Sequence, residues 1–82
     1  MPARRSTTPG DRDPRYRALR TQLKARRKSL KLSQEALAER LGLHKQFVSR
    51  VEMGSRRLDV VEFADYVRAL ELDPSALITE IP

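Results

Sequence analysis

The chain has 82 residues, of which 17 are Lys or Arg and 11 are Asp or Glu, giving a formal net charge of +6. A chain of this length forms one small domain with a modest core. Because it contains no cysteine, disulfide frameworks and thiolate metal sites are excluded. No apolar run approaches the roughly 18 residues of a membrane span, and the first residues show no signal-peptide pattern. We therefore expect a cytoplasmic protein with no cofactor and no membrane partner.

The positive charge is concentrated in the first third of the chain. Residues 1–31 carry eleven Lys or Arg against Asp11 and Asp13, a net charge of +9, whereas residues 32–82 carry six against nine acids, a net charge of −3. Clustered basic side chains release condensed counterions when they meet phosphates. The distribution therefore favours a polyanionic partner such as a nucleic acid. A solvated basic surface is the alternative interpretation.

The first predicted helix follows a polar segment. Residues 1–13 are rich in Pro, Gly, Ser, Thr and Arg and nearly lack apolar side chains, which predicts a flexible basic tail. Asp13 followed by Pro14 is a typical N-cap and first helical position. The helix is expected to extend to about Leu30, with Lys31 at the position where a left-handed glycine often ends such helices. Its buried side is expected to carry Tyr16, Leu19, Leu23 and Leu30.

The segment from Ser33 to Gly54 predicts two short helices joined by a tight turn. Ser33 is a candidate N-cap for a helix over about 34–41, and a second helix is expected over about 45–53, after the poorer cap His44. Gly42 lies between them, where the chain must turn with a positive φ. Apolar spacing gives each helix one inward side, formed by Leu37, Ala38 and Leu41 in the first and by Val48 and Val51 in the second.

Two further helix start signals follow. Asp59 and Glu62 have the spacing of a capping box, and Asp73-Pro74 repeats the pair at the start of the first helix. The inward side of the fourth helix is expected to carry Val60, Phe63, Ala64, Val67 and Leu70, and the short fifth helix contains Leu77 and Ile78. No strand pattern is present, so we expect an all-α domain of five helices over residues 14–80.

One pattern in the helix pair resembles a known family. The residues L-S-Q-x-x-L-A-x-x-L-G-L, continuing to V-S-R-V-E-x-G, are similar to the helix-turn-helix of the phage repressor and Cro class, the XRE family. The similarity extends over about residues 16–78. It implies a compact, lambda-repressor-like fold of five helices that binds double-stranded DNA, with the second helix of the pair in the major groove.

The resemblance also implies roles for particular side chains. The base-contacting positions of the family fall on Lys45, Gln46, Phe47 and Arg50. Gln46 can bind adenine in a bidentate manner, and Lys45 or Arg50 can reach guanine O6 and N7. An exposed Phe47 would pack on a thymine methyl group; the alternative is an aromatic residue packed within the helix pair.

Other positions are expected to contact phosphates or to hold the fold together. The candidate phosphate contacts are Gln34, Ser49, Ser55, Arg56 and Arg57, although Arg56 and Arg57 also fit plain surface charges. Arg4 and Arg5 fit an arm that follows the minor groove, or a tail that aids solubility. The resemblance also implies an ion pair between Arg27 and Glu52 that ties the first helix to the end of the third. A structural role suits Glu52, because a carboxylate beside DNA would repel phosphate.

These expectations favour a sequence-specific transcriptional regulator that binds a palindromic operator as a homodimer. The apolar residues near the end of the chain, Leu72, Leu77, Ile78 and Ile81, are the candidate dimer surface, although some of them must cap the core. An antitoxin or another protein-interaction module, whose DNA binding serves its own regulation, is the alternative. An enzyme is not expected, because His44 is the only histidine and no catalytic or metal-binding set can be assembled from these residues.

Overall fold

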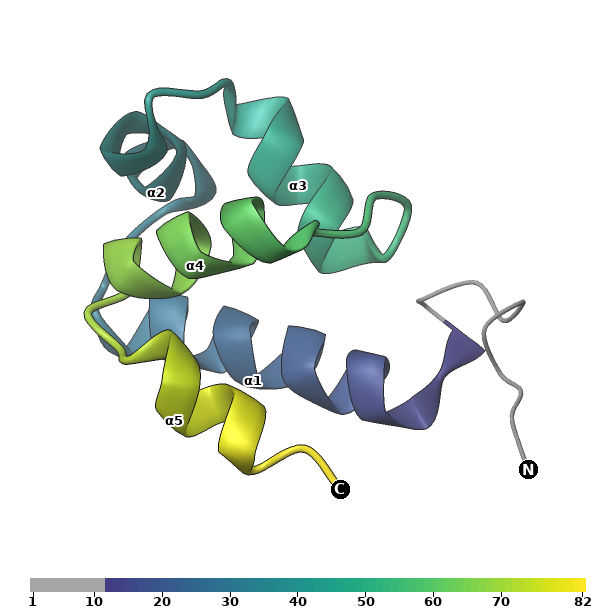
Figure 1. The fold of residues 1–82 in the computed structure, drawn as a ribbon. Helices are drawn as coiled ribbons and strands as arrows, with labels where there is room; N and C mark the ends of the chain where they lie inside the picture. Colours follow the sequence, from purple (N-terminus) through teal and green to yellow (C-terminus); the bar gives the residue numbers. More distant parts are fainter. Residues whose placement is uncertain (1–11) are drawn as a thin grey trace.

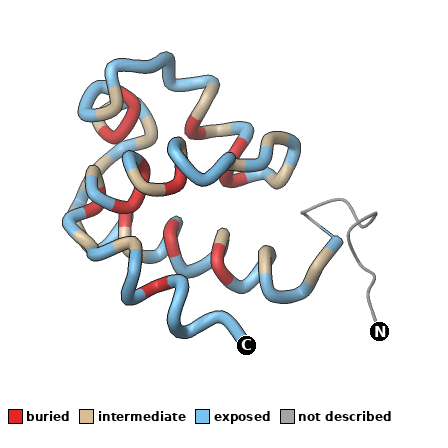
Figure 2. The backbone as a smooth tube through the Cα atoms, in the orientation of Figure 1, coloured by how far each residue is buried: buried red, intermediate tan, exposed pale blue. Residues whose placement is uncertain are grey.

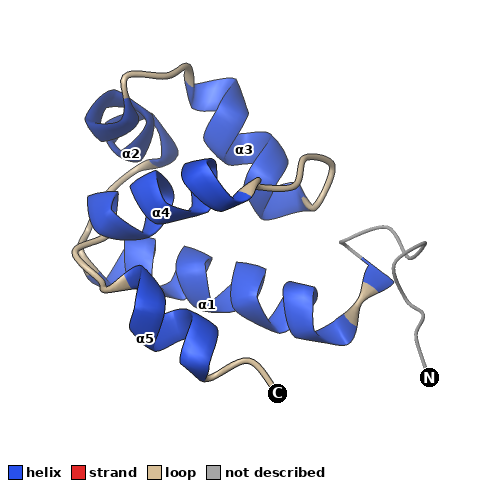
Figure 3. Cartoon of the chain, in the orientation of Figure 1, coloured by secondary structure: helices blue, strands red, loops and turns tan. Residues whose placement is uncertain are grey.

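A computed structural model describes residues 12–82 of the chain (Figure 1). The described part is built from α1 (Pro14–Ser29), α2 (Gln34–Leu41), α3 (Lys45–Met53), α4 (Val60–Ala69) and α5 (Pro74–Thr79). No strand occurs among these residues, so the all-α prediction is confirmed for them (Figure 3). None of the five helices has both the length and the apolar character that crossing a bilayer requires. The predicted tail, apart from Arg12 and Asp13, lies outside the described residues, as do Arg4 and Arg5.

Side-chain caps fix where most of the helices begin. The side chains of Asp13, Ser33, Asp59 and Asp73 each accept a hydrogen bond from a backbone N–H in the first turn of α1, α2, α4 and α5. Such a cap stabilises a helix by about 1 kcal/mol. At α4 the capping box is complete, because Glu62 also accepts a bond from the Asp59 backbone N–H at 3.0 Å. His44 makes no side-chain cap bond at α3, as its poor capping chemistry predicts.

Left-handed residues end the first four helices or follow them directly. Gly42 ends α2 with a φ of 70° and Gly54 ends α3 with a φ of 87°. Lys31 after α1 and Glu71 after α4 adopt the same conformation, with φ values of 63° and 64°. The lysine at the predicted glycine position therefore takes the glycine conformation, which costs roughly 1–2 kcal/mol for a residue with a Cβ.

The core lies between the helices, where the buried positions of all five face one another (Figure 2). Its members are Leu19, Leu23, Leu37, Ala38, Val48, Val51, Phe63, Tyr66, Val67, Leu70 and Leu77. Tyr16, Leu30 and Leu41, which the sequence also placed inward, are partly buried against this cluster. The inward faces predicted for α1, α2 and α3 are therefore largely confirmed.

One expectation about an apolar residue was wrong. Val60 is 74% exposed, because the inward side of α4 is centred on Phe63, Tyr66 and Leu70, and Val60 lies to one side of that line.

The four apolar residues of the candidate dimer surface divide into two pairs. Leu77 is buried in the core and Leu72 is partly buried against it, so these two cap the core. Ile78 and Ile81 are exposed.

Candidate nucleic-acid interface

A tight turn fixes α3 against α2. At the end of α2, the backbone N–H of Gly42 donates to the Glu39 carbonyl at 3.1 Å, and that of Leu43 donates to the Ala38 carbonyl at 2.9 Å. The apolar sides of the two helices are then buried against each other and against α4. Because Ala38 carries only a methyl group and is fully buried, it allows the helices to approach closely.

The outer side of α3 carries the polar residues singled out from the sequence. Lys45, Gln46 and Arg50 are exposed and Ser49 is half-buried, and the spacing of these residues places them on one side of the helix. Within residues 12–82, neither Lys45 nor Arg50 has an ion-pair partner. The first turn of α3 contains no acid, so the positive end of its dipole is not neutralised by its own side chains. This face is well suited to a negatively charged ligand.

Phe47 occupies a different position from its neighbours. Its ring is half-buried against the core, with its centroid 6.3 Å from that of Tyr66, and the Arg56 guanidinium lies 4.7 Å from the ring centroid. The structure therefore supports the packed alternative for Phe47 rather than an exposed ring. The reason is that Phe47 lies one helical turn before the buried Val51, on the same side of α3, where its ring contacts Tyr66 of α4.

Arg56 and Arg57 differ although they are adjacent. Arg56 donates two hydrogen bonds to the Glu62 carboxylate, at 2.9 and 2.7 Å, and one to the backbone carbonyl of Arg57 at 2.7 Å. These Arg56 bonds, with the Asp59 backbone N–H, lower the pKa of Glu62 below its ordinary value. Arg57 is exposed and forms no ion pair within the described part of the chain. Ser55 is also exposed, with its hydroxyl 3.4 Å from the Arg50 carbonyl oxygen.

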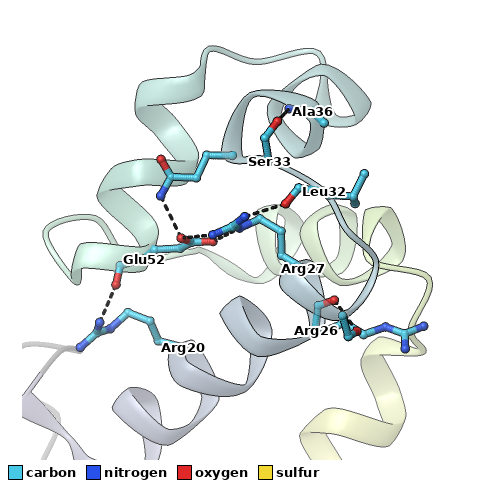
Figure 4. A network of polar contacts seen from close by, with 9 residues as sticks. Arg20, Arg26, Arg27, Leu32, Ser33, Ala36 and Glu52 are labelled. Carbon is cyan, nitrogen blue, oxygen red and sulfur yellow. Dashed lines mark hydrogen bonds and ion pairs between the residues drawn. The ribbon is translucent and has the colours of Figure 1, made fainter.

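A buried polar network lies behind α3 (Figure 4). Arg27 donates to both oxygens of Glu52, at 2.6 and 3.1 Å, and to the Leu32 carbonyl at 2.6 Å. The expected ion pair between α1 and the end of α3 is therefore present, with side chains only 8% and 4% exposed. Gln34 donates to Glu52 Oε1 at 2.9 Å, and Arg20 donates to the Glu52 backbone carbonyl at 2.6 Å. An amide carries two N–H donors, so this bond leaves Gln34 a second one for a phosphate.

Tyr66 is a residue that the sequence analysis missed. It is the largest fully buried side chain of the described residues, and burial raises the pKa of its hydroxyl well above the ordinary value. The hydroxyl has no hydrogen-bond partner within residues 12–82. The spacing of Phe63, Tyr66 and Leu70 is the helical signal that could have identified it. The Tyr66 ring packs against the Phe47 ring and so supports the start of α3.

Comparison with known proteins agrees with this arrangement. A helix-turn-helix family matches residues 23–77, which include α2, α3 and α4. The chain belongs to this family. A solved structure of an XRE-family like protein from Pseudomonas syringae pv. tomato str. DC3000 is 41% identical, with 85% of each chain covered and a TM-score of 0.80. No curated protein matches the chain.

The family membership indicates what the exposed face of α3 is for. This chain is an XRE-type helix-turn-helix protein, and the family is one of DNA-binding regulators. In such proteins α3 is the recognition helix, the element that enters the major groove. The structure holds that helix by the buried network at its end and by Phe47 near its start, and leaves its outer side open.

Proposed function

We propose that this protein is a transcriptional regulator that recognises a particular DNA sequence through the outer side of α3. The observation that carries the proposal is the exposed set Lys45, Gln46 and Arg50, which has no ion-pair partner within residues 12–82 and lies at the start of the recognition helix. Gln46 is suited to adenine, and the two cations are suited to guanine. Phe47 supports the helix instead of contacting bases.

Phosphate contacts are proposed around this set. Arg57 and Ser55 lie in the loop after α3, and Ser49 lies at the edge of the exposed face. Gln34 is the first residue of α2, where the helix dipole also favours an anion, and Glu35 in the same turn offsets part of that effect. Arg56 is a weaker candidate, because Glu62 already neutralises its charge.

We further propose that two copies of the chain bind together. A shallow groove of about 300 Å³ between α1, α4 and α5 is lined by apolar side chains, among them Val60, Phe63, Ile78 and Ile81. Val60, Ile78 and Ile81 are all exposed around it, and a group of exposed apolar side chains, unlike a single one, marks an interaction surface. A single module of this size buries roughly 600–1,000 Å² on DNA, so pairing two modules is a direct way to increase affinity.

Selection of bound duplexes from a random pool tests the function. We expect enrichment of two half-sites with two-fold symmetry, with centres separated by about one helical turn of 10–10.5 base pairs or a multiple of it. Failure to enrich any sequence, with binding that is equal on random DNA, would show that the protein does not recognise a particular site.

A pair of variants tests the dimer. Ile78→Asp places a charge at the groove, whereas Val61→Asp places the same charge at an exposed position that does not line it. Sedimentation should show that the wild type and Val61→Asp are dimers and that Ile78→Asp is a monomer. A wild type that is monomeric alone but copurifies with another protein in equal amount would favour the interaction module over the dimeric regulator.

A further inference from the structure

Helix α1 has an unusual charge pattern for a surface helix. Its 16 residues include seven Lys or Arg and no Asp or Glu. Exposed helices commonly alternate the two signs, since like charges one turn apart destabilise a helix by about 0.2–0.5 kcal/mol per pair. Basic residues in the last turn, such as Lys28, are favoured by the helix dipole. That effect falls off within one turn, so it does not explain cations earlier in the helix.

The charges that the fold does not use lie along one side of α1. Arg17, Lys24 and Lys28 are exposed, and their spacing of seven and four residues aligns them on the helix surface. We call these three residues the α1 strip. Within residues 12–82 none of them forms an ion pair or a side-chain hydrogen bond. Arg27, in contrast, is fully engaged by Glu52.

The α1 strip lies beside the residues of α1 that contact the recognition helix. Arg20 and Arg27 contact the end of α3 (Figure 4). Each is three residues from a strip member, so the strip lies next to them on the helix surface. On the opposite flank, Ala18 and Gln22 line a groove with α5, and the cations there are held by the fold, Arg15 by Asp13 and Arg26 by the Leu70 carbonyl. The flank whose cations are unpaired within residues 12–82 therefore adjoins the recognition helix.

We propose that the α1 strip is a second DNA-contacting surface, which binds phosphates of the backbone beside the groove that α3 enters. The strip is proposed to bind the same duplex as α3, because it adjoins the residues that contact the end of α3 and its positive charge complements the negatively charged DNA backbone. From Arg17 to Lys28 the strip spans about 16 Å at 1.5 Å per residue, long enough to follow several phosphates of one strand. Arg17 lies outside the family match, which begins at residue 23, whereas Lys24 and Lys28 lie within it.

The inference rests on the proposed DNA binding but not on sequence recognition. The test variant is Arg17→Gln with Lys24→Gln, which removes two charges while keeping good helix formers. The control for net charge is Arg40→Gln with Arg68→Gln, which removes two exposed charges from α2 and α4; of the two, Arg40 is paired with Glu71 and Arg68 has no ion-pair partner within residues 12–82. Thermal unfolding of both variants checks that neither one has lost its fold.

The first measurement is the slope of log affinity against log salt concentration, on the selected duplex and on random duplex. Each lost phosphate contact should reduce the slope by about 0.9. We expect a reduction of about two for the strip variant on both duplexes and little change for the control. Equal reductions in the two variants would indicate a general effect of net charge and would overturn the proposal.

The second measurement is ethylation interference, which locates the phosphates. The wild type should show a group of sensitive phosphates that the strip variant no longer shows and that the control retains. Identical maps for all three proteins would overturn the proposal. A strip variant that binds DNA as the wild type does but no longer binds vesicles of anionic phospholipid would also overturn it. A wild type that binds DNA without sequence preference would contradict the proposed regulator alone, because the salt slope on random duplex would still report on the strip.

Discussion

The two sides of the recognition helix use charge in opposite ways. On the inner side, Glu52 is buried and receives hydrogen bonds from Arg27 and Gln34. On the outer side, Lys45 and Arg50 are exposed and have no ion-pair partner within residues 12–82. The inner charges, on Arg27 and Glu52, connect α1 to α3. The outer charges, on Lys45 and Arg50, make no ion pair that would stabilise the described part of the fold.

This difference gives a simple criterion for function in a small domain. A polar side chain whose partners are already inside the fold is expected to affect stability when it is changed. A polar side chain without such partners is expected to affect binding. Net charge does not make this distinction, because Arg56 and Arg57 carry the same charge and differ only in their contacts.

The largest expected effect is on the inner side. Glu52→Gln keeps the shape of the side chain but leaves the Arg27 guanidinium buried without a countercharge. We expect the free energy of unfolding to fall by about 3–5 kcal/mol, as measured by urea denaturation. That is a large part of the roughly 5–15 kcal/mol that stabilises a domain.

A second variant shows whether the charge itself is responsible. Arg27→Met combined with Glu52→Met removes both charges and fills the space with apolar atoms, which in other buried pairs is often neutral or stabilising. We therefore expect the double variant to be more stable than Glu52→Gln. A loss below 1 kcal/mol for Glu52→Gln would mean that water or a rearranged neighbour compensates Arg27.

The outer side should give the reverse result. Gln46→Ala is expected to weaken binding to the selected site by about 1–3 kcal/mol and to relax the preference at one base pair. Unfolding should change by no more than about 0.5 kcal/mol, since the side chain is exposed. Gln22→Ala, the same change at an exposed position of α1, is the matched control and should alter neither quantity. An equal loss of affinity on selected and random DNA would show that Gln46 does not read bases.

The sequence predicted the helices well because the signals are local. N-caps at Asp13, Ser33, Asp59 and Asp73 act within one turn, and the glycine at position 42 is required by the backbone of the turn itself. Apolar spacing identified most of the core for the same reason. The end of α1 had a weaker signal, because Lys31 stands where a glycine often ends such helices, and the structure gives this lysine the left-handed conformation.

The site was only partly predictable, because its contacts join distant parts of the chain. The place of Phe47 depends on Tyr66 and Arg56, which come from α4 and from the loop before it. The sequence pattern alone could not show that Arg56 would be held by Glu62, because that requires the path of the loop as well as the capping box. Spacing could give the exposed side of α3, but not the partners of each charge.

The smallest expected effect is the difference in salt slope between variants of the adjacent arginines, one paired within the fold and one unpaired. Arg57→Gln should reduce the salt slope of binding by about 0.9 on every duplex, with little change in stability. Arg56→Gln should leave most of the slope intact, because Glu62 already neutralises that cation, and should lower stability slightly through the lost pair with Glu62. Both variants carry the same charge change at neighbouring positions, so each is the control for the other. Equal slopes would mean that Arg56 leaves Glu62 when DNA arrives, and that contacts seen without a ligand do not decide which charges are available to it.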